Sequence, residues 1–137
     1  MPTEEFQIRT PRHDAMVDIT AEVEKIVVDS DVREGIALVY TPHTTSAITI
    51  NENADPDVVH DMLAQFTEMV PWRQPFFDHG EGNSAAHVKS SMIGASETIP
   101  IVKGRLALGT WQGIYFCEFD GPRSRRVRVQ ILAENED

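Results

Sequence analysis

Three apolar segments follow one another in the last third of the chain with only short turns between them, and this order constrains the fold most. The segments are residues 98–102, 111–119 and 125–132. In the last one, Val127, Val129 and Ile131 alternate with polar residues, which is typical of a strand with one buried face. Strands joined without a helical crossover pair in antiparallel fashion. The pattern therefore favours an α+β fold over a strictly alternating α/β fold.

The first two thirds of the chain mix strands with helices. We expect strands at residues 5–9, 16–19, 36–40 and 47–50. The run at 36–40 is continuously apolar, so we expect it to be buried on both faces.

Three segments have helical signals. Helical spacing begins at Thr20, which can cap the helix, and Asp55 and Pro56 are a natural N-cap and first residue for a helix over residues 56–70. A shorter helix over residues 84–93 ends at Gly94. We therefore predict one compact domain over residues 1–137, with a largely antiparallel or mixed sheet packed with two or three helices.

The charge balance limits the partners. Lys and Arg number 12 against 22 Asp and Glu, a formal net charge of −10. This argues against nucleic acid and anionic membranes as partners, because both need a basic face. Residues 1–10 contain no apolar core of a signal peptide, and the single Cys117 cannot form an intrachain disulfide. We expect a cytoplasmic protein with no membrane span.

Three histidines lie in polar loops or at a helix start. His43 lies in TPHTTS (41–46), His79 in DHGEGN (78–83) and His87 in AHVKSS (86–91). Three converging imidazoles would suit a catalytic zinc with one open position. Their spacing alone favours three separate histidines with ordinary hydrogen bonds, since no two share one helix at ligand spacing.

Other polar segments are candidates with structural alternatives. The segment NENADPD (51–57) is rich in oxygen atoms that could hold a cation or a substrate hydroxyl, or could form only a turn with a helix cap. GEGNS (80–84) leads into a helix N-terminus, with Lys89 further on, and could bind a phosphate or be a plain turn.

Two late features also remain open. Trp111 and Gln112 in GTWQG (109–113) could face a planar ligand, although the residues alone favour Trp111 in the core. The only basic cluster could steer an anionic substrate, pair across a subunit interface, or be a solvated strand face; it comprises Arg123, Arg125, Arg126 and Arg128.

Several motifs, taken together, resemble the YjbQ family, also called UPF0047. They are HTTSA (43–47) with NENADP (51–56), EG (81–82) with HVKSSMIG (87–94), and GR (104–105) with GTWQG (109–113). The match runs in order over nearly the whole chain. Two departures are that NSAA (83–86) stands where some members have an Asp pair, and Ala54 stands where others have Cys.

The resemblance implies a small α+β protein that forms homotrimers and has a weak, secondary thiamine-phosphate synthase activity, which joins a thiazole phosphate to a pyrimidine pyrophosphate. By motif position it implies a catalytic set of His43, His79, His87, Glu52 and Asn53. The same three histidines would be the metal ligands. The implied substrate-binding residues are Ser46, Lys89, Arg105, Trp111 and Gln112.

Three functions therefore stand as hypotheses. The first is the synthase, using zinc, or magnesium with the pyrophosphate, and acting on small phosphorylated molecules. The second is a metal-dependent hydrolase of a small phosphorylated or amide substrate. The third is a non-catalytic protein that binds a small anion. If a subunit interface borders the site, we expect Arg105 or the late arginines to come from a neighbouring subunit.

Overall fold

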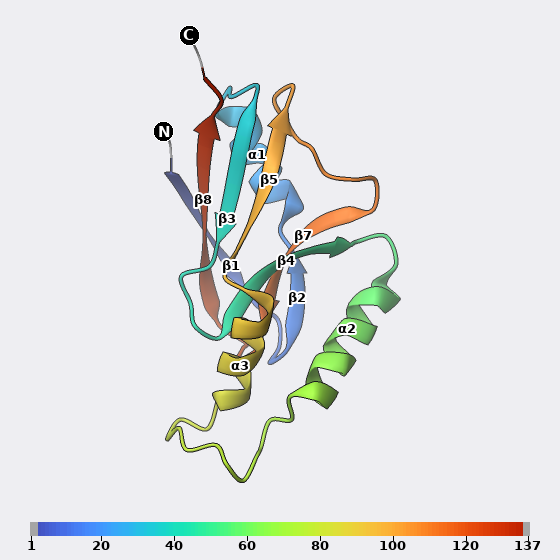
Figure 1. The fold of residues 1–137 in the computed structure, drawn as a ribbon, viewed down its shortest axis with the longest axis vertical. Helices are drawn as coiled ribbons and strands as arrows, with labels where there is room; N and C mark the ends of the chain where they lie inside the picture. Colours follow the sequence, from blue (N-terminus) through green and yellow to red (C-terminus); the bar gives the residue numbers. More distant parts are fainter. Residues whose placement is uncertain (1–2, 136–137) are drawn as a thin grey trace.

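The computed structural model describes residues 3–135 and contains eight strands and three helices (Figure 1). In chain order they are β1 (Thr3–Arg9), β2 (Ala15–Asp18), α1 (Thr20–Asp29), β3 (Gly35–Tyr40), β4 (Ser46–Glu52), α2 (Pro56–Met69), α3 (Ser84–Ile93), β5 (Ser96–Val102), β6 (Arg105–Leu106), β7 (Gln112–Glu118) and β8 (Ser124–Ala133).

The strands form two antiparallel sheets. The first has the order β1-β8-β3-β5-β6, and the second has the order β2-β7-β4. In the first sheet β8 lies between β1 and β3, with Val127 opposite Phe6 and Val129 opposite Val39. The α+β class, the antiparallel pairing and the three helices are as the sequence predicts.

The doubly buried strand is β7, not β3. Ile114 and Phe116 join a core cluster that includes Val23 and Val27 of α1, while Cys117 packs in a second cluster on the other face of β7. The expectation that the 36–40 strand is buried on both faces is wrong, because α1 covers only one face of the first sheet (Figure 1). Ile36, on the other face, is 38% exposed.

The helix starts differ in their chemistry. Asp55 is the N-cap of α2, as predicted, and its Oδ1 accepts a hydrogen bond from the amide of Asp57 at 2.9 Å. Thr20 is not a cap; it is the first residue of α1, and its Oγ1 accepts from the Ile114 amide at 2.9 Å. Asp18 Oδ1 accepts from the Thr20 amide instead.

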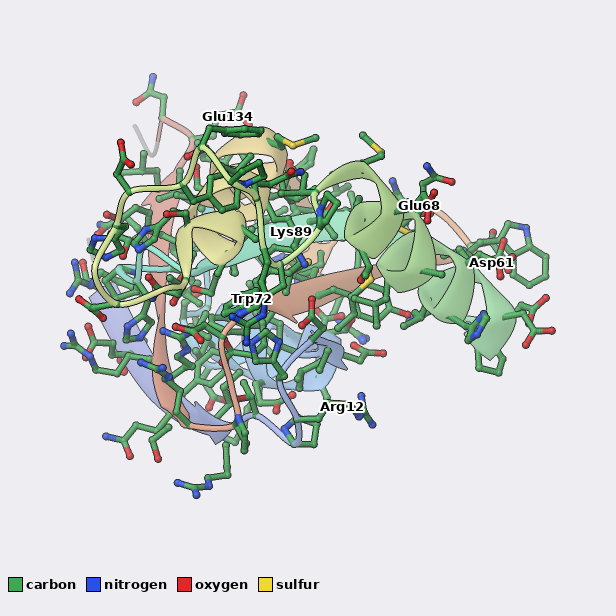
Figure 2. All side chains as sticks on the ribbon, turned by 90° about the horizontal axis from the view of Figure 1, so that it is seen from below. Arg12, Asp61, Glu68, Trp72, Lys89 and Glu134 are labelled. Carbon is green, nitrogen blue, oxygen red and sulfur yellow. The ribbon has the colours of Figure 1, made fainter. Side chains whose placement is uncertain are left out.

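Helix α2 projects from the body of the molecule (Figure 2). Its apolar stripe is present, but none of its residues is buried, and Met69 is 53% exposed. Within residues 3–135, no helix has both the length and the apolar content needed to cross a bilayer.

The buried Cys117 should not react with thiol reagents in the folded protein. Burial raises the pKa of its thiol to about 12, so almost no thiolate forms at neutral pH. We expect no labelling by a disulfide reagent in the native state and complete labelling in urea. Rapid native labelling would show that β7 opens locally.

Candidate active site

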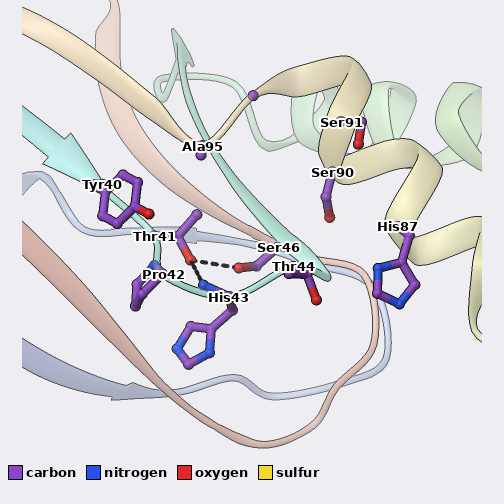
Figure 3. A pocket seen from close by; sticks show the side chains of 11 residues that line it. Tyr40, Thr41, Pro42, His43, Thr44, Ser46, His87, Ser90, Ser91 and Ala95 are labelled. Carbon is purple, nitrogen blue, oxygen red and sulfur yellow. Dashed lines mark hydrogen bonds between the residues drawn. The ribbon is translucent and has the colours of Figure 1, made fainter.

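A cavity of about 560 Å³ lies where β3 ends, β4 begins and α3 passes (Figure 3). Its wall is rich in hydroxyl and imidazole groups, from residues Tyr40, Thr41, His43, Thr44, Ser46, His87, Ser90 and Ser91. The size falls within the range of small-molecule sites. Of the sequence-predicted site residues, His43, Ser46 and His87 meet here.

Local hydrogen bonds fix the segment that connects β3 to β4. The hydroxyl groups of Thr41 and Ser46 are 2.7 Å apart, and the His43 amide donates to Thr41 Oγ1 at 3.3 Å (Figure 3). The Thr41 amide donates to the Ala95 carbonyl, just after α3. The hydroxyl-rich sequence of this segment therefore builds one wall of the cavity.

His43 is held as a neutral imidazole. Its Nε2 accepts a hydrogen bond from the Arg126 amide at 2.9 Å, so the proton of the neutral ring lies on Nδ1. Burial, followed by the charges of Arg125 and Arg126, lowers the pKa of His43 below its ordinary value. The hydrogen bond and the pKa direction agree, since a protonated Nε2 could not accept.

This state predicts a loss of stability in acid. As the pH falls through the ordinary histidine pKa of 6.5, the unfolded chain binds a proton at His43 and the folded chain does not. The free energy of unfolding should therefore decrease with falling pH and level off below the folded pKa. In urea unfolding between about pH 5 and pH 8, His43→Gln should flatten this slope, while His60→Gln on exposed α2 should not. Parallel curves for wild type and His43→Gln would contradict the assignment.

The other two predicted histidines lie together at the start of α3. The His79 and His87 rings pack edge to face with centroids 5.5 Å apart. Both line a second cavity of about 480 Å³, with Phe76, Phe77, Asp78, Ser84 and Val88. His87 therefore borders both cavities, and the second lies at the helix start where the sequence suggests an anion site.

One chain does not assemble the predicted zinc site. Within residues 3–135, no group of three or more His, Cys, Asp or Glu side chains is arranged to hold one metal ion. Figure 3 shows the His43 and His87 rings apart, and Nε2 of His43 is already engaged by a backbone amide. A zinc with all three histidines as ligands does not fit the residues that a single chain brings together.

Lys89 and Arg105 lie outside both cavities. Lys89 is 4% exposed, and its Nζ donates to Asp14 Oδ2 at 2.9 Å and lies over the Phe119 ring. Arg105 is exposed and pairs with Glu24 of α1 at 2.8 Å. The expected grouping of these two cations with the histidines is therefore absent from the single chain, because acidic side chains elsewhere pair with them.

The remaining predicted residues gather at the far end of β4. Ser46 and Glu52 are separated by the length of this strand, about 20 Å. At that end the Glu52 carbonyl accepts from Tyr115 Oη, and Asn53 donates to Asp18 from its side chain. Gln112 Oε1 accepts from the Gly109 amide, and Trp111 is 63% exposed. The expectation of a core Trp111 is wrong, since it precedes β7 rather than lying within it.

The four late arginines all have acidic partners. Arg123 pairs with Asp120, and Arg126 and Arg128 pair with Glu5. Arg125 is buried and forms a two-point ion pair with Glu118, which sequence reasoning missed. A glutamate inside the apolar run 114–119 was the available signal, because a buried carboxylate requires a partner.

Comparisons with known proteins agree with this architecture. The family model described as UPF0047 protein YjbQ-like matches residues 4–134. The UPF0047 protein YugU of Bacillus subtilis is 56% identical over 127 residues, covering 93% of this chain and 96% of its own. The UPF0047 protein MJ1081 of Methanocaldococcus jannaschii is 50% identical, covering 94% of this chain and 93% of its own.

Two crystal structures have the same fold. A YjbQ/UPF0047 family protein from Clostridium acetobutylicum superposes with a TM-score of 0.92 at 51% identity, covering 94% of this chain and 99% of its own. The protein APE1520 from Aeropyrum pernix also has a TM-score of 0.92, at 39% identity, covering 98% of this chain and all of its own.

Proposed function

We propose that this chain, which belongs to the UPF0047 YjbQ-like family, is a transferase that joins two small phosphorylated substrates. The reaction we assign is thiamine-phosphate synthesis as a secondary activity. One substrate would be a pyrimidine pyrophosphate and the other a thiazole phosphate.

The observation that carries the proposal is the pair of adjacent cavities that share His87. A reaction joining two molecules needs two neighbouring sites, and the cavities measure about 560 and 480 Å³. A hydrolase of one substrate needs only one cavity besides its water. The two-cavity arrangement therefore supports a transferase more than the hydrolase that the sequence also allows.

The reaction would need no covalent intermediate on the protein, whose role would be to stabilise charge. The bond between the pyrimidine methylene carbon and the pyrophosphate oxygen breaks, and pyrophosphate leaves with the electron pair. The thiazole nitrogen forms the new carbon–nitrogen bond and becomes positively charged. Amide groups at the start of α3 and imidazole N–H groups of His79 and His87 would stabilise the departing negative charge.

His43 would have a separate role in the hydroxyl-lined cavity. As a neutral ring with its proton on Nδ1, it can donate one hydrogen bond to a bound substrate. Ser46 and the other hydroxyl groups of this wall would add donors. A magnesium ion, if used, would arrive bound to the pyrophosphate, as is usual for this ion.

We also propose a cytoplasmic homotrimer. None of the residues of α2 is buried in the single chain. This exposure supports a contact between α2 and another copy of the chain. A neighbouring copy could also bring Glu52, Asn53, Trp111, Gln112 or Arg105 to the histidine cavities. Light scattering tests the assembly, and a monomer at working concentration would refute it.

The decisive experiment is turnover of the two phosphorylated precursors by the purified chain. We expect thiamine phosphate to form in the wild type and more slowly in His43→Ala. No product from the wild type would refute the synthase assignment, and equal rates in the two proteins would exclude His43 from the reaction. Saturable binding of the precursors without turnover would favour the non-catalytic anion-binding alternative.

A further inference from the structure

A buried ion pair lies behind the segment that carries His43. Glu118 is fully buried and Arg125 is 3% exposed. Arg125 donates from Nε to Glu118 Oε1 at 2.7 Å and from Nη2 to Glu118 Oε2. Thr10 Oγ1 and the Asp120 amide complete the hydrogen bonds to this carboxylate.

The same guanidinium contacts the 41–46 segment, which forms one wall of the hydroxyl-lined cavity. Nη2 of Arg125 donates to Thr45 Oγ1 at 2.8 Å and approaches the Thr45 carbonyl at 3.5 Å. The Phe119 amide also donates to that carbonyl. Thr45 is buried and lies next to Ser46, so these bonds hold the 41–46 segment from behind.

The next residue of β8 holds the segment at a second point. Tyr40, the last residue of β3, lies opposite Arg128, so Arg126 lies two residues beyond the paired part of these strands. The Arg126 amide donates to His43 Nε2 at 2.9 Å. The imidazole thus takes the place that a strand carbonyl would occupy, and adjacent residues of β8 bind both Thr45 and His43.

We propose that Arg125 is a positioning residue. Glu118 fixes the guanidinium of Arg125, which in turn holds Thr45 in place. In this arrangement His43 Nε2 accepts the hydrogen bond of the Arg126 amide, and Nδ1–H is available to donate to a ligand in the cavity. Arginine suits this role because its planar guanidinium can donate hydrogen bonds to a carboxylate and a hydroxyl at the same time. The inference rests on the proposed function only in treating the cavity as the substrate site.

Two matched threonine variants separate positioning from stability. Thr45→Val keeps the side-chain shape and the Glu118–Arg125 pair but removes the Oγ1 acceptor. Thr10→Val removes a hydrogen bond to Glu118 of the same pair, together with the hydrogen bonds between Thr10 Oγ1 and the Arg123 backbone. Thr10→Val loses more hydrogen bonds than Thr45→Val, so its decrease in stability should be at least as large, and it is a stringent control for general loosening of the fold.

The readouts are the imidazole nitrogen NMR signals of His43 and hydrogen exchange of the Arg126 amide. In wild type and Thr10→Val, we expect Nε2 to have the shift of an unprotonated ring nitrogen and Nδ1 that of a protonated one. In Thr45→Val, we expect averaged shifts and about three- to tenfold faster exchange of the Arg126 amide.

Unchanged signals and exchange in Thr45→Val would overturn the proposal. Equal changes in Thr10→Val would also overturn it, because they would reflect general loosening of the fold. Neither readout requires catalysis. If the wild type fails to make thiamine phosphate while these shifts appear as expected, the proposed function fails and the positioning role stands.

Discussion

On the proposed synthase function, the His87→Ala variant is expected to form thiamine phosphate about 100-fold more slowly than the wild-type chain. His87 lines both cavities, so its loss removes a hydrogen-bond donor from both proposed substrate sites. The side chain is only half-buried, so we expect the fold to be retained. The measurement is the steady-state rate with both precursors, together with the thermal unfolding temperature.

His60→Ala is the matched control. It removes an imidazole from exposed α2, where His60 contacts Asp61. Its rate should equal that of the wild type. A His87→Ala rate within threefold of the wild type would place the reaction elsewhere on the molecule.

The Glu118→Leu variant should lose about 3–5 kcal/mol of unfolding free energy, because it leaves the Arg125 charge buried without a carboxylate. The Thr10 hydroxyl and the Asp120 amide lose an acceptor in the same step. Urea unfolding measures this loss directly. It would be the largest stability effect among the substitutions considered for this chain.

The double variant Glu118→Leu/Arg125→Met tests the cause. It replaces both charges with apolar groups, so it should be more stable than Glu118→Leu alone. Asp29→Asn, which breaks the exposed pair with Lys25, should have no measurable effect. A loss below about 1 kcal/mol in Glu118→Leu would mean that water reaches Arg125 in the fold.

Local signals in the sequence predict most of the secondary structure. Asp55 and Pro56 locate the start of α2, and the alternation of Val127, Val129 and Ile131 predicts the buried face of β8. Whether a strand is covered on both faces depends on how the two sheets pack. This is why apolar β3 has one partly exposed face, whereas residues 113–118 of β7 are buried on both faces.

The sequence indicates His43, Ser46 and His87 as candidates, although the spacing of the histidines alone favours three separate residues. His43 and Ser46 follow β3, and His87 lies on α3, so the loop and the helix start reveal them. The acidic partners of Lys89 and Arg105 could not be predicted from local sequence signals. Asp14 neutralises Lys89 from 75 residues away in sequence, and no local pattern encodes such a pairing.

The position of β8 between β1 and β3 has a consequence for synthesis on the ribosome. The five-stranded sheet cannot join β1 to β3 until residues 124–133 have left the exit tunnel. The second sheet likewise cannot form before β7 is available, because β2 and β4 each pair with β7 and not with each other. Nascent chains that end before β7 therefore present unpaired strand edges, which makes them substrates for chaperones and proteases.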